Sequence, residues 1–177
     1  MSSPQNKTFR LRRALLEDSE AIRQVATETW HKTFATTIDS SNRERVLSRS
    51  YSDNALRRAL CRADLDSWFW VVESEEKPPE IIGFAEVILR PGINPDAELT
   101  RIYVLPCWQG CGVGQALLEA MLNTLRQLKP TRLWLSVLAH NQGAITFYER
   151  RGFQFFREFY ANLPGQLLEM QEYVLEL

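Results

Sequence analysis

The first half of the chain shows two strand patterns separated by helical ones. Phe9–Arg12 alternates apolar and basic residues, which is typical of a half-buried strand. After Asp18, which we expect to be an N-cap, apolar residues recur at helical spacing. Less regular apolar clusters within 31–66 predict one or two short helices. Two runs rich in strand formers, separated by a polar loop with a Pro-Pro pair, then predict an antiparallel hairpin over 68–72 and 81–89.

The second half alternates strands with helices. A loop over 91–95 precedes a strand at Glu98–Leu105, and a glycine-rich turn leads into a helix that ends before Pro130. Leu133–Leu138 is a continuous apolar run, the type of strand that is buried on both faces. A short helix at Asn141–Arg151 follows, and the last two strands begin at 153 and 168.

This element order predicts the fold class. We expect one α/β domain over residues 1–177, with a mixed central sheet of about seven strands and helices on both faces. The hairpin makes the N-terminal part of the sheet antiparallel. The later strand–helix–strand order predicts a parallel C-terminal part.

Composition and charge narrow the class of protein. The 177 residues contain 21 Lys+Arg and 22 Asp+Glu, a net charge of −1, which gives no electrostatic reason to expect nucleic-acid or membrane-surface binding. The polar N-terminus and the lack of a run of ~20 apolar residues predict neither a signal peptide nor a membrane span. Three cysteines, an odd number, suit a reducing compartment, so we expect a cytoplasmic protein.

Cysteine and histidine positions do not predict a metal site. Cys107 and Cys111 are four residues apart, but the third cysteine is the distant Cys61 and the only histidines are His31 and His140. A closed zinc site therefore lacks ligands, and we expect reduced thiols and no bound metal.

The turn Gln109–Gly114 is the strongest candidate for chemistry. Backbone N–H groups between a strand and a helix favour a pyrophosphate, and glycine lets the ligand approach the main chain. Glycines at 110, 112 and 114, followed by Gln115-Ala116, fit neither the Rossmann spacing nor the P-loop ending. Both nucleotide-binding motifs therefore fail on spacing, and coenzyme A is the remaining ligand of this kind.

The segment Glu98–Leu118 resembles the GNAT superfamily of N-acetyltransferases. That family's motif, Gln/Arg-x-x-Gly-x-Gly/Ala, follows a strand ending in Tyr-Val-x-Pro, and Gln109, Gly112 and Gly114 occupy its fixed positions. Asn141–Phe153 is similar to the family's second block, Asn-x-x-Ala-x-x-Phe-Tyr followed by Gly-Phe. The close match covers about 98–156. A weaker resemblance to PaiA-type polyamine acetyltransferases lies in Thr29-Trp30, Thr33-Phe34, Arg101–Tyr103 and Trp134-Leu135.

The resemblance implies acetyl transfer from acetyl-CoA to a primary amine by direct attack in a ternary complex. Tyr148 stands where the family donates a proton to the departing thiolate, and the backbone N–H of Val104 where it stabilises the oxyanion. Cys111 replaces a basic residue common in the family, so phosphate binding would rest more on backbone amides. The positions implied to contact the cofactor are Ile102, Tyr103, Val104, Gln109, Gly110, Cys111, Gly112, Val113, Gly114, Gln115 and Asn141.

An alkyl amine with a pKa near ~10.4 must lose a proton before it attacks. We expect Glu98 to accept this proton, directly or through water, although a solvated strand residue is an equal reading of Glu98. The acceptor is expected to be a small-molecule amine such as a polyamine. A protein lysine or N-terminal acetyltransferase fits almost as well, and a CoA-binding regulatory module without turnover is a third reading. A homodimer is left open.

Overall fold

The computed structural model describes residues 7–61, 66–90 and 96–177. The polar N-terminal residues 1–6 and the expected loop over 91–95 lie outside this part of the chain. Its seven strands form one sheet in the order β1-β2-β3-β4-β5-β7-β6. The strands are β1 (Phe9–Arg13), β2 (Ser67–Ser74), β3 (Ile81–Arg90), β4 (Asp96–Val104), β5 (Arg132–Leu138), β6 (Gln154–Leu163) and β7 (Gln166–Glu176).

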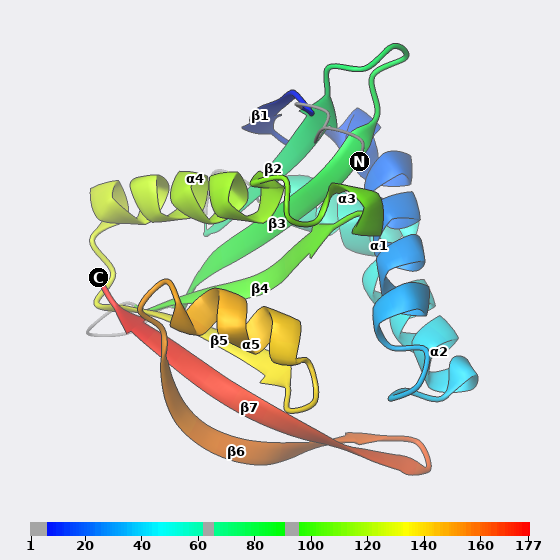
Figure 1. Ribbon diagram of the computed structural model, residues 1–177, viewed down its shortest axis with the longest axis vertical. Helices are drawn as coiled ribbons and strands as arrows, with labels where there is room; N and C mark the ends of the chain where they lie inside the picture. Colours follow the sequence, from blue (N-terminus) through cyan, green and yellow to red (C-terminus); the bar gives the residue numbers. More distant parts are fainter. Residues whose placement is uncertain (1–6, 62–65, 91–95) are drawn as a thin grey trace, which may run out of the picture.

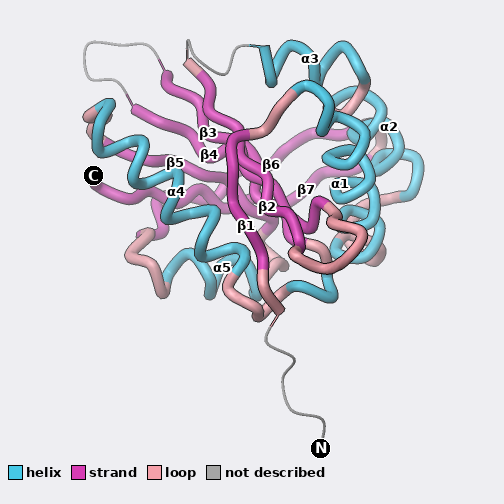
Figure 2. The backbone as a smooth tube through the Cα atoms, turned by 90° about the horizontal axis from the view of Figure 1, so that it is seen from above, coloured by secondary structure: helices cyan, strands magenta, loops and turns pink. Residues whose placement is uncertain are grey.

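Helices cover both faces of the sheet, as Figures 1 and 2 show. One face packs against α4 and α5 and the other against α1, α2 and α3. The helices are α1 (Ser19–Thr33), α2 (Ser40–Ser50), α3 (Asp53–Cys61), α4 (Val113–Leu128) and α5 (Gln142–Glu149). None of the helices within the described ranges is long and apolar enough to cross a membrane.

The expected α/β class with a mixed seven-stranded sheet is confirmed, but the parallel part is smaller than predicted. Among the described strands only β4 and β5 pair in parallel, whereas β7 pairs antiparallel with both β5 and β6. Because β7 lies between β5 and β6, these two strands run in the same direction without touching. The strand–helix–strand pattern therefore gave the relative direction of β5 and β6 correctly, and β7 lies between them.

The apolar spacing of α4 explains its position. Val113, Leu117, Met121 and Leu125 recur every four residues and are completely buried in the largest core cluster, between the sheet and α4 and α5. Burying four such side chains contributes roughly 1.5–3 kcal/mol each to the hydrophobic free energy of folding. The N-terminus of α4 is thereby held beside the end of β4.

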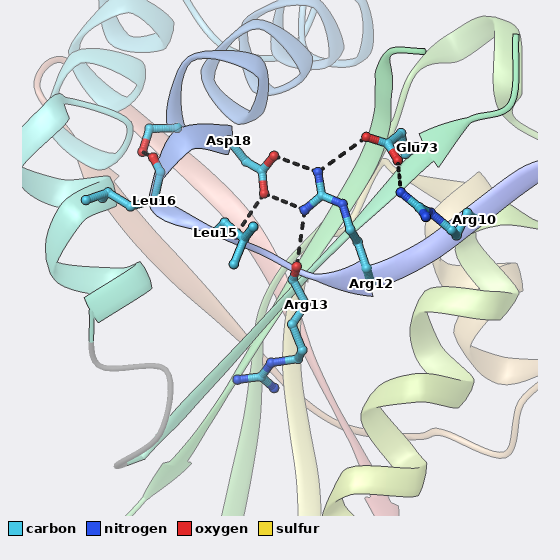
Figure 3. A network of polar contacts seen from close by, with 8 residues as sticks. Arg10, Arg12, Arg13, Leu15, Leu16, Asp18 and Glu73 are labelled. Atoms are coloured by element: carbon cyan, nitrogen blue, oxygen red, sulfur yellow. Dashed lines mark hydrogen bonds and ion pairs between the residues drawn. The ribbon is translucent and has the colours of Figure 1, made fainter.

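Asp18 stands at the N-cap position of α1, but its carboxylate does not cap the helix. It accepts hydrogen bonds from both terminal nitrogens of Arg12, at 2.7 and 2.8 Å, and from the Leu15 N–H, at 2.7 Å (Figure 3). Burial acts to raise the pKa of Asp18, but these hydrogen bonds and the charge of Arg12 outweigh burial and lower the pKa. Arg12 also contacts Glu73, so this ion-pair network joins β1, β2 and the start of α1.

Candidate active site

β4 and β5 pair along only part of their length and then separate. Ala97–Leu99 pairs with Leu133–Leu135, whereas 100–104 and 136–138 have no partner in each other. Figure 1 shows the two strands diverging beyond the paired part. We call the region between 100–104 and 136–138 the split.

The Val104 peptide faces the split. The next residue, Leu105, donates its N–H to Ile82 O of β3 at 2.9 Å. Because neighbouring peptides of a strand point to opposite edges, the N–H and C=O of Val104 point away from β3, toward β5. The carbonyl accepts a hydrogen bond from Gln109 Nε2 at 3.1 Å. Gln109 thus orders the end of β4, and the Val104 N–H is left for a ligand in the split.

The glycine turn leads directly into the start of α4. Gly110 and Gly112 have φ of +78° and +87°, and a Cβ on either would meet no atom within 4 Å. Gly112 is the N-cap of α4, and no side chain caps the helix there. The first N–H groups of α4, from Val113 onward, therefore have no acceptor within the helix. Such a site suits a pyrophosphate.

A groove between α4 and α5 continues from this turn and was not found from the sequence. Its volume is about 490 Å³, and its lining includes Gln115, Arg150 and Arg151. Arg151 stacks on the Phe147 ring at 3.7 Å and donates to Phe147 O at 2.8 Å. The same ring lies 3.4 Å from where a Cβ on Gly114 would be, so the glycine allows close packing of the two helices. The groove holds the two guanidinium groups together with the carboxylate of Glu119.

Tyr148 lies in α5 among aromatic rings and is 7% exposed. Phe147 and Phe153 pack edge-on against its ring, with centroids 5.3 and 5.5 Å away. Burial, and secondarily Tyr103, raises the pKa of Tyr148, so the phenol stays protonated at neutral pH. This is the protonation state that a proton donor requires.

Tyr103 reaches the split from the opposite face. Its ring packs against Trp30 and Phe84 on the side of α1, while Ile102 and Val104 pack on the side of α4. Burial raises the pKa of Tyr103, and the neighbouring Trp30, Arg101 and Tyr51 partly offset this. The indole N–H of Trp30 is buried but outside hydrogen-bonding geometry. Tyr103 also contributes, after burial, to the raised pKa of Tyr148.

The structure does not bring Glu98 to the split. Glu98 lies in the paired part of β4, opposite Ile88 and Trp134, and forms an ion pair with Arg90 at 2.6 Å. Val104 is six positions further along β4, which corresponds to about 20 Å along a strand. An amine that reacts beside the Val104 peptide is therefore too far from Glu98 to pass a proton to it directly.

Glu86 of β3 is a buried carboxylate whose two oxygens both have partners. It is 5% exposed and contacts Arg101 Nε at 2.8 Å, while Thr100 and Ser67 donate hydroxyl hydrogen bonds to it at 2.8 and 3.2 Å. Arg101 in turn donates to Ser50 O at the end of α2. This neutralised pair holds β3 and β4 to α2, and sequence reasoning missed it because its partners are far apart in the chain.

The remaining expected cofactor residues lie around the split and the turn. Asn141 is the N-cap of α5, where its Oδ1 accepts the Ala144 N–H at 3.3 Å and its Nδ2 has no partner in the described structure. Gln115 donates to Glu119 at 2.8 Å, and Val113 is fully buried, so Val113 can offer only its main chain. In the described residues no group of three or more His, Cys, Asp or Glu could hold a metal ion.

Comparisons with known proteins identify the family. The protein-family model "Acetyltransferase (GNAT) family" matches residues 22–153, well over half of the chain. The chain belongs to this family. Acetyl-CoA is the cosubstrate typical of GNAT family members.

The relatives of this GNAT family member include proteins named for polyamines. The spermidine N(1)-acetyltransferase of Thermoplasma acidophilum is 26% identical over 149 residues, covering 83% of this chain and 89% of the relative. The spermine/spermidine N(1)-acetyltransferase of Bacillus subtilis is 35% identical over 82 residues, or 43% of this chain and 54% of the relative. N-acetyltransferases of Mycobacterium bovis and Mycobacterium tuberculosis are 38% identical over 74 residues. This chain spans about half of their length, 46%.

A solved structure shows the same fold. The PaiA N-acetyltransferase of Thermoplasma acidophilum in complex with coenzyme A superposes with a TM-score of 0.74 at 25% identity, covering 93% of this chain and 98% of that one. The predicted GNAT resemblance, including its similarity to PaiA-type enzymes, is confirmed by these findings.

Proposed function

We propose that this enzyme transfers the acetyl group of acetyl-CoA to a primary amine of a small molecule, with linear polyamines as the first class to test. The observation that carries the proposal is the near full-length match to a spermidine N(1)-acetyltransferase. The geometry of the split supports it, because the site offers separate groups for the thioester and for the amine.

The pyrophosphate of acetyl-CoA binds the N–H groups at the start of α4, and the thioester lies in the split. The Val104 N–H donates to the thioester oxygen, which gains negative charge as the amine attacks. Arg150 and Arg151 supply the fixed positive charge that the turn lacks and bind the 3′-phosphate in the groove. Asn141 Nδ2 binds the pantetheine arm.

The amine approaches from the face of α1 and α2. The Tyr103 oxygen accepts a hydrogen bond from the amine N–H and directs the nitrogen lone pair at the acetyl carbon. The C–N bond forms, the C–S bond breaks, and Tyr148 donates its proton to the departing thiolate. The amide nitrogen loses its surplus proton to water, and water returns one proton to the Tyr148 phenolate, which restores the starting enzyme. This scheme needs no covalent acyl-enzyme.

The test measures CoA thiol release with acetyl-CoA and a panel of acceptors. We expect turnover with spermidine and spermine well above the rate without an acceptor. Turnover with peptides only would assign the enzyme to protein acetylation, and tight CoA binding without turnover on any acceptor would make it a regulatory module. Either result would overturn the proposal.

A further inference from the structure

Lys7, which precedes β1, contacts the segment that leads into the glycine turn, although 100 positions separate the two in the sequence. Its Nζ donates to Cys107 O at 2.7 Å and lies 4.6 Å from the centroid of the Trp108 ring. Trp108 is only 5% exposed and packs in the largest core cluster, so these contacts hold the ammonium in a fixed place. The Cys111 N–H donates to Trp108 O at 3.4 Å. The glycine turn therefore folds directly against the residues that Lys7 contacts.

The sheet topology brings Lys7 to the edge where the turn and α4 begin. Successive antiparallel pairs join β1 to β2, β2 to β3 and β3 to β4, so the start of β1 and the end of β4 lie at the same edge. The first pairing continues to Thr8, whose carbonyl accepts the Glu75 N–H at 3.1 Å. Phe9 and Leu11 pack in the core cluster beneath α4, and the alternation of side chains along a strand puts Lys7 on their face. The ammonium therefore lies on the α4 side of the sheet.

The Lys7 ammonium has a donor left for an anionic partner. It carries three N–H groups, of which Cys107 O uses one and the face of the Trp108 ring a second. Among the residues that the structure describes, no carboxylate forms an ion pair with Lys7. Residues 109–115 carry no charged side chain, and Cys111 stands where a basic residue is common in the family. Lys7 is thus a cation beside a turn that has none of its own.

We propose that Lys7 binds the pyrophosphate of acetyl-CoA and replaces the basic side chain that is absent at Cys111. This inference rests on the proposed function, since it assigns a residue to the cofactor site of that reaction. The ammonium keeps its hydrogen bond to Cys107 O and gives its remaining N–H to a phosphate oxygen, as a charge-assisted hydrogen bond. The start of α4 supplies backbone N–H groups to the same pyrophosphate. Two segments that are distant in the sequence thus share one anion.

The experiment measures the Kd of CoA by calorimetric titration for the wild type, Lys7→Met, Lys7→Arg and Lys129→Met. Methionine keeps an apolar stem over Trp108 and removes the charge, whereas arginine keeps the charge. Lys129→Met is the matched control, because it removes the same charge at the far end of α4, about 24 Å away along the helix. We expect Lys7→Met to weaken CoA binding about tenfold, the size of one hydrogen bond to a charged group. Lys7→Arg and Lys129→Met should stay within about twofold of the wild type, since the first keeps the cation and the second lies beyond the screening length.

A ligand series assigns the lost contact to one chemical group. Dephospho-CoA keeps the pyrophosphate and lacks the 3′-phosphate, and pantetheine lacks every phosphate. We expect Lys7→Met to weaken the binding of CoA and of dephospho-CoA by the same factor. The binding of pantetheine, measured by ligand-observed NMR, should be unchanged.

An unchanged CoA affinity in Lys7→Met, or no recovery of affinity in Lys7→Arg, would overturn the proposal. An equal loss of pantetheine affinity would also overturn it, because Lys7 would then only hold the Cys107–Trp108 segment in shape. If Lys7→Met unfolds at the assay temperature, Lys7→Gln takes its place with the same expectations, since it keeps a donor for Cys107 O without the charge. Turnover with peptides alone would instead refute the small-amine acceptor of the proposed function, and the Lys7 result would stand because it is measured by CoA binding.

Discussion

Gly112 offers the sharpest test of the cofactor site. It is the N-cap of α4, its φ is +87°, and a Cβ there would enter open space. Gly112→Ala therefore has two effects that can be separated. The left-handed backbone costs an L-residue roughly 1–2 kcal/mol of folding stability. The new methyl group also occupies the space above the N–H groups of α4, where the proposed pyrophosphate lies.

The size of the second effect follows from the contacts that the methyl group displaces. A hydrogen bond from an N–H to a charged group contributes about 1.5–3 kcal/mol. Losing one such bond to the pyrophosphate weakens CoA binding about 10-fold to 150-fold, because every ~1.4 kcal/mol is a factor of ten in Kd.

Gly165→Ala provides the matched control. Gly165 also has a positive φ, +70°, and open space where a Cβ would be, but it lies in the β6–β7 turn. Chemical denaturation without ligand should show a similar loss of stability in both variants. Calorimetric titration with CoA should show weaker binding in Gly112→Ala alone. Wild-type CoA affinity in a folded Gly112→Ala protein would refute the assignment of the turn.

Three further predictions follow from the site and the core. Tyr148→Phe should lower kcat about tenfold to a thousandfold with little change in acetyl-CoA affinity, and a wild-type kcat in the variant would make Tyr148 a packing residue. Because burial raises the pKa of Tyr148, the kcat of the wild type should show no loss from phenol ionisation below about pH 10. The kcat of Glu98→Gln should stay within about twofold of the wild-type kcat from pH 6 to 9, since Glu98 lies about 20 Å along β4 from Val104. A kcat that falls at low pH and recovers at high pH would place Glu98 in the proton path. Asp18→Asn should lower the free energy of unfolding at pH 7 by about 2–3 kcal/mol, near the lower end for a broken buried ion pair because Arg12 is partly exposed. The pKa of Asp18 is lowered on folding, so the stability that Asp18 adds is present above its unfolded pKa of about 3.9 and is lost as pH falls through the lower folded value. If wild type and variant differed in free energy of unfolding by the same amount at pH 7 and at pH 2, this linkage would be contradicted.

The sequence predicted most of the elements, because each carries a local signal. The apolar stripe of α4, the continuous apolar run of β5 and the glycines of the turn are all short-range patterns. The pairing of β7 between β5 and β6 has no such signal, since it depends on which strand edges meet after the chain has collapsed.

The candidate site was predictable only where it is local. The turn and Tyr148 belong to contiguous motifs, whereas the place of Glu98 depends on where β5 leaves β4. A bulge at Thr100, where the β3–β4 register shifts, also decides which face Glu98 occupies. The contacts of Glu86 with Arg101, and of Asn42 with Gln166, join different elements and leave no pattern in the sequence.

The central claim is direct acetyl transfer to a small amine, and one single-turnover measurement tests it. Protein in excess over isotope-labelled acetyl-CoA is mixed with spermidine, and mass spectrometry follows the label in the small-molecule and protein fractions. The account predicts one labelled acetylspermidine for each CoA released and no label on the protein. Label on the protein, whether as an acyl-enzyme or on its own lysines, or acetyl-CoA left intact beside spermidine, would contradict it.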